Sequence, residues 1–439
     1  MHPKVVRKIL DFVGTKDHPQ GRGSPIAARA GLEDTTYSLH RNRESQNLGV
    51  RHCDLMRVAG AKATVQFLAL LLGSGILAGC PFAVEAQAAK AAAYLEEIRS
   101  ETGTPGISAA VYHRGQLVFS EGVGYADLDQ LTPTSSSTVY NIGSVSKAIT
   151  AVAVLQQVER GRVELDDPIQ KYVPSYPEKR WPVTIRHLLT HTSGIRHYRD
   201  SDFPDDPEFH QNCRSYSSLE QAIGIFKEDP LLFEPGQHYS YTSYGTNLLQ
   251  GVVETASGLG FEDYLRKRIW VPAGMLRTAL DIPDRIVRHR ARGYLVENGS
   301  VRNHPWEDLT YKFAGGGMIG TAEDLVRFAL ALNAGQLLEK ETLELMWRPH
   351  VDPVLIFNGD DEPILEDRWR LGLTWRLRED AQGRGYVYAA GTVKGFNAVL
   401  VNYRDDELVV ALVGNGHPVT PALREAWALA ELFFDQPPS

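Results

Sequence analysis

The amino-acid sequence predicts one α/β (α+β) domain, in which a sheet with flanking helices carries an inserted helical lobe. Short apolar runs typical of strands occur near residue 110 and again after residue 385, whereas residues 180–380 show mostly helical periods broken by Pro and Gly. We find no internal repeat and no long linker between these regions. The composition, 43% hydrophobic and 23% charged, is that of a globular protein.

The expected elements begin with an alanine-rich helix over residues 89–102. Two strands should follow, Ile107–Tyr112 and Gln116–Ser120, and the intervening Arg114-Gly115 indicates a hairpin. From Ser144 onward the apolar residues recur at helical spacing until Gly161. A helix is therefore expected to start at Ser144.

Strand character returns near the C-terminus, and a helix closes the domain. The expected strands are Leu371–Leu377, Tyr386–Tyr388, Ala398–Asn402 and Leu408–Gly414, and the helix is Pro421–Phe434.

The region that begins at Met56 has the order of a secretory signal peptide. Arg57 and Lys62 precede an apolar stretch at 65–77 that is too short to span a bilayer comfortably. Two processing sites compete: Ala86-Gln87-Ala88 suits signal peptidase, whereas Leu77-Ala78-Gly79-Cys80 resembles a bacterial lipobox with a lipidated Cys80. A single membrane anchor or a buried helix is the alternative.

These features divide the chain into three parts. Residues 1–55 are polar, without a sustained apolar period, and are expected to be a disordered or over-called leader before a true start at Met56. Residues 56–88 are the expected signal peptide, and 89–437 the folded domain. The expected location is the periplasm, with or without an outer-membrane lipid anchor through Cys80.

Charge and cysteine content exclude several partners. The net charge of −8 leaves no electrostatic footprint for nucleic acid. The three cysteines, Cys53, Cys80 and Cys213, have neither metal-type nor redox-type spacing, so a disulfide scaffold is not expected.

The main chemical signal is Ser144-Val145-Ser146-Lys147 at the start of the expected helix. Residues i and i+3 share one face of a helix, so the amine of Lys147 can reach the Ser144 hydroxyl. The amine accepts a proton only when it is neutral, which requires burial or neighbouring cations. The alternative is a serine cap followed by a solvated lysine.

Further segments appear in the order of a known family. They are Leu188–Ile195, Phe233–Gly236 leading into Tyr241-Thr242-Ser243, and Ala314–Gly317 before Thr321–Asp324. With the Ser-x-x-Lys segment they resemble the class C β-lactamase and penicillin-binding-protein family over roughly residues 100–430. Tyr172–Lys179, Ser193–Tyr198 and Tyr311–Gly317 are most similar to its mitochondrial serine β-lactamase-like branch.

The resemblance implies a β-lactamase/transpeptidase-like fold, with an antiparallel sheet flanked by helices and an all-helical lobe. It assigns Ser144 as the nucleophile, Lys147 as its activator and Tyr241 to the second motif. There, a phenolate or a phenol coupled to Lys147 would move the serine proton. Ser243 replaces the Asn of the family pattern and keeps a hydrogen-bonding group for substrate.

The third motif departs from the family, which has Lys-Thr-Gly or His-x-Gly on a strand that forms a wall of the site. The corresponding residues are Ala389-Ala390-Gly391, so the positive side chain is missing. The N–H groups of Thr392 and Ser144 are expected to form an oxyanion hole. Whether the nearby Lys394 replaces the missing charge stays open.

Other signals are weaker. His187 and His191 have the i, i+4 spacing of a metal pair, but no third ligand is evident, and His191 is expected to make a local backbone bond. The glycines at 315–317 indicate close packing before a helix capped by Thr321. No metal and no cofactor are therefore expected.

The sequence thus predicts a serine hydrolase that forms an acyl-enzyme with an ester or a peptide/amide substrate. The degraded third motif argues against typical β-lactams. The alternative is a catalytically impaired binding or scaffold protein on the same fold. The expected partner is a small-molecule or peptide substrate, and the sequence does not indicate an oligomeric state.

Overall fold

The computed structural model describes residues 81–203, 212–357, 359, 364–393, 395–417 and 423–434. The expected leader, the signal segment as far as Cys80, and Lys394 lie outside these ranges. Helix α2 begins at Pro81, so the expected processing site at Ala88 falls within its 22 residues. Among the described helices, none is both long enough and apolar enough to cross a membrane.

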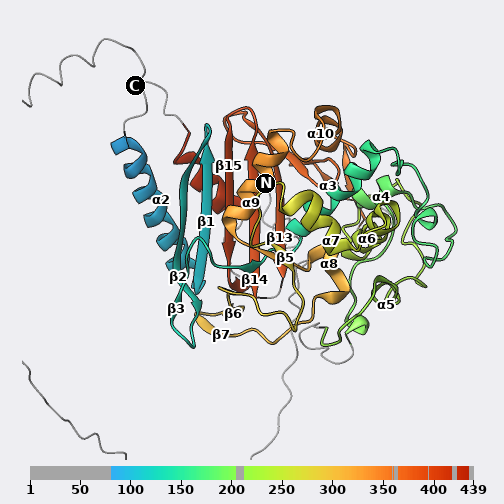
Figure 1. The fold of residues 1–439 in the computed structure, drawn as a ribbon, viewed down its shortest axis with the longest axis horizontal. Helices are drawn as coiled ribbons and strands as arrows, with labels where there is room; N and C mark the ends of the chain where they lie inside the picture. The colour runs from blue at the N-terminus through green and yellow to red at the C-terminus, as the bar shows by residue number, and fades with distance from the viewer. Residues whose placement is uncertain are drawn as a thin grey trace, which may run out of the picture. The chain divides into compact units, whose positions relative to one another are not determined.

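Within the described ranges, eight antiparallel strands form the main sheet, in the order β11-β12-β13-β14-β15-β1-β2-β3 (Figure 1). The strands are β1 (Gly106–His113), β2 (Gln116–Asp127), β3 (Thr132–Pro133), β11 (Arg370–Leu371), β12 (Arg376–Glu379), β13 (Gly385–Val393), β14 (Phe396–Tyr403) and β15 (Leu408–Gly414). Strand β1 pairs with both β2 and β15, which joins the two ends of the domain in one sheet.

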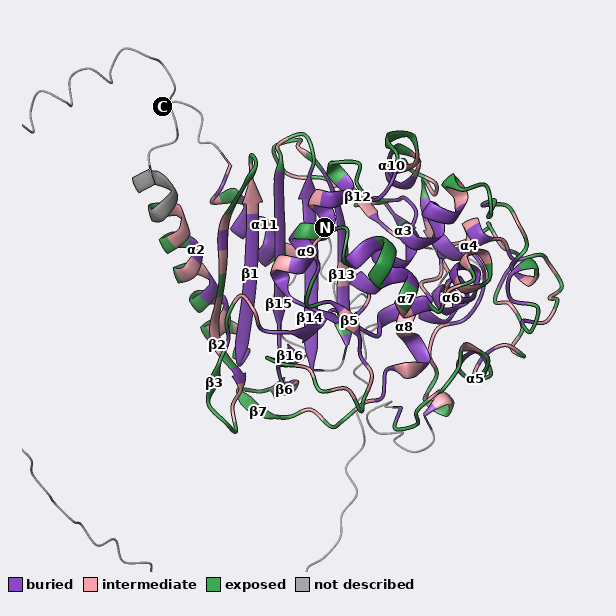
Figure 2. Ribbon diagram, in the orientation of Figure 1, coloured by how far each residue is buried: buried purple, intermediate pink, exposed green. Residues whose placement is uncertain are grey.

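Helices cover both faces of this sheet, which explains why its central strands β14 and β15 are buried at every position. On β15, Val410 and Leu412 pack with α2 (Pro81–Thr102) and α11 (Leu423–Glu431). Val409 and Ala411 belong to the larger core on the other face, which includes α9 (Ala322–Asn333). All seven residues of β15 are therefore buried (Figure 2).

The remaining helices lie mainly on the sheet face opposite α2 and α11 and in the lobe (Figure 1). They are α3 (Val145–Glu159), α4 (Ile185–Leu189), α5 (Leu219–Ile223), α6 (Ser243–Ser257), α7 (Phe261–Leu265), α8 (Phe313–Gly316), α9 (Ala322–Asn333) and α10 (Lys340–Trp347). Helix α3 contacts α6 and α8 of the lobe as well as β13 and β14 of the sheet. It therefore lies at the junction of the sheet and the lobe.

Several expected elements are confirmed. Arg114 and Gly115, with φ of 48° and 84°, form the turn between β1 and β2, as a two-residue hairpin loop requires. Helix α3 follows Ser144 and ends at Glu159. The expected strands after residue 385 correspond to β13, β14 and β15.

Two expectations are wrong. Leu371–Leu377 is not one strand, because Thr374 has a φ of 67° and donates its N–H to Leu189 O in the lobe at 2.8 Å, which separates β11 from β12. A tertiary contact thus overrides an apolar run.

The region 180–380 is also less helical than expected, because it contains short strands. They are β5 (Ala279–Leu280), β6 (Tyr294–Glu297), β7 (Ser300–Asn303), β8 (Met318–Gly320), β9 (Val354–Ile356) and β10 (Ile364–Glu366). Strand β8 pairs with β4 (Tyr140–Asn141), which leads to Ser144, and β6 pairs with β16 (Gly416–His417). These strands are too short for periodicity to reveal them.

Candidate active site

Ser144 lies where the chain passes from a strand into a helix. β4 pairs with β8, Gly143 turns the chain with a φ of 50°, and Ser144 is the N-cap of α3. Its side chain makes no capping hydrogen bond, so the hydroxyl remains available for other partners. Ser144 therefore lies at the start of a helix, as the apolar spacing predicted.

Lys147 lies in the first turn of α3 and is 3% exposed. Its Nζ lies 3.0 Å from Ser144 Oγ and 2.9 Å from Ser243 Oγ, and it donates to the carbonyl oxygen of Gly315. The lysine is therefore buried and has no ion-pair partner among the described residues, and its amine is held against the Ser144 hydroxyl.

In the structure Ser144 Oγ, Ser243 Oγ and Gly315 O each accept a hydrogen from Lys147 Nζ. A neutral amine has two N–H donors and one lone pair, and these partners can accommodate it as well. The Gly315 carbonyl can only accept, and Ser243 Oγ can accept the second hydrogen, which leaves the lone pair for the Ser144 hydroxyl proton. Burial lowers the pKa of Lys147 well below its usual value, and the positive charges of Lys312 and Arg376 lower this pKa further. Lys147 is thereby prepared to accept a proton at a lower pH than an exposed lysine would.

Tyr241 approaches Ser144 from the segment that precedes α6. Its hydroxyl donates to Ser144 Oγ at 2.5 Å, and its ring lies 4.8 Å from Lys147 Nζ. Loss of solvent around the hydroxyl raises the pKa of Tyr241. Of the two forms considered from the sequence, the geometry therefore fits the phenol, which acts as a proton donor.

Tyr241→Phe is expected to lower kcat by about 10²-fold, because the ring is kept and only the proton-donating hydroxyl is lost. Steady-state turnover of a phenyl ester measures this change. Tyr172→Phe is a matched control, since that hydroxyl bonds to Asp167 and Arg162 O instead. Equal turnover by wild type and Tyr241→Phe would exclude Tyr241 from proton transfer.

Two histidines that pack against the Tyr241 ring hold the segment in place. The centroids of the His191 and His197 rings lie 4.7 Å and 5.4 Å from that of Tyr241. The Nδ1 atoms accept from the N–H groups of Thr242, at 3.4 Å, and Ser243, at 3.3 Å. Both rings are therefore neutral, consistent with burial that lowers the pKa of His197 to about 3.

His191 thus makes a backbone bond as expected, but to a residue 51 positions away and not to a local one. His187 Nδ1 instead accepts from the Thr184 N–H in the cap of α4. The Nδ1 atoms of His187 and His191 thus both accept from main-chain N–H groups. The described residues contain no cluster of three or more metal-ligating side chains.

The predicted third motif borders Ser144 through its main chain. A Cβ on Gly391 would lie 2.5 Å from Ser144 N and 2.2 Å from Ile142 O, and one on Gly143 would lie 2.8 Å from Thr392 N. Only glycines allow β13 to approach the start of α3 this closely. The contact brings the N–H groups of Ser144 and Thr392 to the same small region, as an oxyanion hole requires.

Sequence reasoning did not identify two cations at the site. Ser144, Lys312 and Arg376 line the same cavity of about 360 Å³, together with Ser243 and Thr392. Arg376 belongs to β12, and Lys312 precedes α8. Nothing in the charged stretch around Arg376 distinguishes it from a solvated strand edge, so only the sheet pairing reveals it.

Ala389, the position of the missing cation, is 5% exposed and packs in the core on the α3 side of the sheet. It borders a narrow recess beside Ser144 and Lys147, which Arg376 also lines. Arg376 of β12 and Ala389 of β13 therefore border the same recess.

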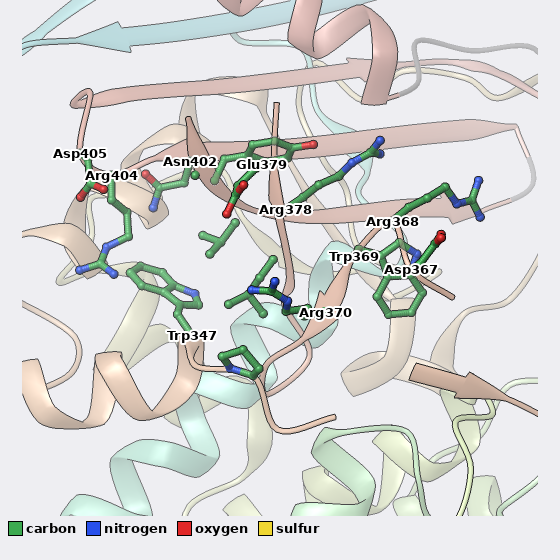
Figure 3. Close-up of a pocket in the computed structure, with 15 residues that line it drawn as sticks. Trp347, Asp367, Arg368, Trp369, Arg370, Arg378, Glu379, Asn402, Arg404 and Asp405 are labelled. Carbon is green, nitrogen blue, oxygen red and sulfur yellow. The ribbon is translucent and has the colours of Figure 1, made fainter. Parts of the chain in front are cut away.

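A second cavity, of about 430 Å³, lies further along β12 and β13 and is not lined by Ser144 (Figure 3). Arg378 and Glu379 of β12 line it, together with Trp347 and Arg404. Arg378 also packs on the Trp427 ring at 4.6 Å. Arg376 and Arg378 of β12 therefore line different cavities.

Comparison with known proteins agrees with this geometry. Residues 91–433 match the β-lactamase family. The mitochondrial serine β-lactamase-like protein LACTB of mouse is 32% identical over an alignment that covers 68% of this chain and 70% of that protein. For human LACTB, also 32% identical, the alignment covers 58% of this chain and 61% of the human protein. The octameric penicillin-binding protein homologue from Pyrococcus abyssi superposes with a TM-score of 0.67 at 27% identity, covering 78% of this chain and 77% of that one. The chain belongs to the β-lactamase family, within the β-lactamase and penicillin-binding-protein superfamily of serine hydrolases.

Proposed function

We propose that this protein hydrolyses an ester or amide substrate through an acyl-enzyme on Ser144. The observation that carries the proposal is the buried Lys147, whose amine lies 3.0 Å from Ser144 Oγ with no carboxylate at hydrogen-bond distance among the described residues. A lysine in such surroundings is a proton acceptor. The Tyr241 hydroxyl on the same oxygen supplies the proton donor.

The reaction follows from these positions. Ser144 Oγ bonds to the substrate carbonyl carbon while its proton moves to Lys147 Nζ, and the N–H groups of Ser144 and Thr392 stabilise the oxyanion. The bond to the leaving group then breaks, and Tyr241 gives that group its phenolic proton. The ammonium of Lys147, near the Tyr241 ring, restores the phenol.

Deacylation repeats the same proton movements with water. Water attacks the acyl carbon and its proton returns to Lys147, after which the acyl bond breaks and Ser144 recovers its hydroxyl proton. The products are a carboxylic acid and the free alcohol or amine, so atoms and protons balance without a cofactor.

A fluorophosphonate probe tests the proposal directly, because Ser144 would displace fluoride and retain the phosphonyl group. The probe mass is expected on Ser144 after digestion and fragmentation. Ser144→Ala should lose the label. Ser146→Ala should keep it, because the Ser146 hydroxyl is buried and donates to Gly143 O at 2.6 Å.

Folded wild-type protein without label, or with label on another residue, would overturn the proposal. The binding or scaffold alternative would then be favoured, since such a protein has no need of an activated serine.

A further inference from the structure

The narrow recess beside Ser144 has room for one very small molecule. Its volume is about 10 Å³, which is about the space that a single buried water needs. Ser144 and Lys147 border it, together with His191, Thr374 and Arg376. The recess is therefore too small for a part of the substrate, but it lies next to the nucleophile and its base.

Two of the residues that line this recess have a strained backbone. Thr374 and His191 adopt φ of 67° and 54°, in the left-handed region. Thr374 is the only β-branched residue with a positive φ in the part of the chain that the structure describes, and branching at Cβ makes this conformation unfavourable. Its N–H donates to Leu189 O at 2.8 Å, which holds the residue in place. Such strain is typically kept where it positions a group for function.

Both strained residues also carry a polar group without a protein partner. The Thr374 hydroxyl is buried and has no hydrogen-bond partner among the described residues. His191 is 2% exposed, and its Nδ1 accepts from the Thr242 N–H, so the neutral ring carries its proton on Nε2. No described residue accepts a hydrogen bond from that Nε2. Buried polar groups without a protein partner commonly bind an ordered water.

Other polar side chains of the recess already have partners. The Arg376 guanidinium bonds to the Tyr239 hydroxyl, the Tyr241 hydroxyl donates to Ser144 Oγ, and Lys147 Nζ lies on the same oxygen. A small molecule in the recess would therefore be held mainly by the two strained residues. Water suits them, because it accepts from an imidazole N–H and can either donate to a hydroxyl or accept from it.

We propose that the recess binds a single water between the Thr374 hydroxyl and His191 Nε2, and that this water hydrolyses the acyl-enzyme on Ser144. The inference rests on the proposed function. Once Ser144 is acylated, its oxygen has no proton to give to Lys147, so the amine can accept one from the neighbouring water. The water oxygen bonds to the acyl carbon while its proton moves to Lys147 Nζ. The bond from the acyl carbon to Ser144 Oγ then breaks as Lys147 returns the proton to Oγ, which releases a carboxylic acid.

The size of the recess predicts hydrolysis without acyl transfer to alcohols. Methanol carries a methyl group for which a recess of one water has no room, whereas attack from the open cavity of about 360 Å³ would admit either molecule. Turnover of phenyl butyrate in rising concentrations of methanol should therefore give butyrate and no methyl butyrate with the wild-type protein. Gas chromatography of the products measures their ratio.

Thr374→Gly tests where the water lies, because glycine adopts a positive φ without strain and leaves a larger recess. This variant should form methyl butyrate in amounts that rise with the methanol concentration. Glu407→Gly is the matched control. Glu407 also has a positive φ, of 51°, but it does not line the recess, so this variant should form no methyl butyrate.

Thr374→Val separates deacylation from acylation. Valine keeps the branched shape and the strain but loses the hydroxyl, so deacylation should slow by about 10-fold, the scale of one hydrogen bond. The rate of fluorophosphonate labelling should stay at the wild-type value, since labelling needs no water. The butyryl-enzyme should then accumulate, which intact-protein mass spectrometry detects. Thr374→Ser keeps a hydroxyl and should restore deacylation.

Methyl butyrate formed by the wild-type protein in proportion to methanol would overturn this inference and leave the proposed function intact, and this result needs no variant to fold. Equal slowing of labelling and deacylation in Thr374→Val would overturn it as well. Absence of both ester turnover and fluorophosphonate label in folded wild-type protein would overturn the inference and the proposed function together.

Discussion

Lys147→Met should lower kcat/KM for ester hydrolysis by about 10⁴-fold, near the upper end of the contribution of a proton-transfer group. Methionine keeps an unbranched side chain of similar length but has no lone pair of comparable basicity to accept the Ser144 proton. The hydroxyl would then attack without a base. Steady-state kinetics with a phenyl ester measures the loss.

Lys179→Met is the control for the loss of a lysine that binds main-chain carbonyls. Lys179 Nζ donates to Asp229 O at 2.9 Å and to Lys227 O, away from Ser144. This variant should retain wild-type turnover. Lys147→Met could also lose activity because less of the protein is folded, which a lower thermal unfolding temperature would reveal. If the folded fraction of this variant kept wild-type activity, a role of Lys147 as the base would be contradicted.

The pH profile gives an independent test of the same residue. Only neutral Lys147 accepts a proton, so kcat/KM should rise with pH through the pKa of Lys147. Because burial and nearby cations lower that pKa, the rise should be complete well below pH 10.5, the ordinary value for lysine. A rise centred at the ordinary lysine pKa would show that the buried amine is charged in the free enzyme.

Gly391→Ala is expected to reduce kcat by about 10³-fold, the scale of losing an oxyanion-hole donor. The added methyl would lie 2.2 Å from Ile142 O and 2.5 Å from Ser144 N, both of them main-chain atoms. Strand β13 must therefore shift away from the start of α3, which separates the Thr392 and Ser144 N–H groups.

Gly385→Ala on the same strand provides the control. A Cβ at Gly385 meets no atom within 4 Å, so this variant should keep both activity and stability. Fluorophosphonate labelling rates and thermal unfolding separate a catalytic defect from a folding defect. Wild-type kcat in a folded Gly391→Ala protein would exclude the oxyanion hole from this position.

Much of the core of the site was predictable because its signals are local. A helix places residues three apart on one face, so Ser144 and Lys147 meet wherever that helix forms. Gly391 and Tyr241 followed from ordered segments that resemble a family. The glycines at 315–317 were correctly predicted as close packing, since a Cβ on Gly315 would lie 2.9 Å from Ser243 O.

The interactions that make Lys147 reactive were not readable from any one segment. Its amine meets Ser243 and Gly315, which lie 96 and 168 residues further along the chain. Whether a lysine is buried depends on how the lobe packs against the sheet, and hydrophobic periodicity does not contain that information. The packing of His191 and His197 against the Tyr241 ring was likewise not predictable from the sequence.

The sequence by itself placed Ser144 and Lys147 on one face of a helix, because spacing along a helix needs no tertiary contact. Its resemblance to the family assigned their proposed roles and indicated the cation missing at Ala389. Only the tertiary structure decided where charge remains at the site. Arg376 reaches the recess because β12 pairs with β13, and strand pairing joins residues by hydrogen bonds between main chains, whatever their side chains. The presence of the Arg376 charge at the Ser144 cavity was therefore not readable from the sequence of β12 alone.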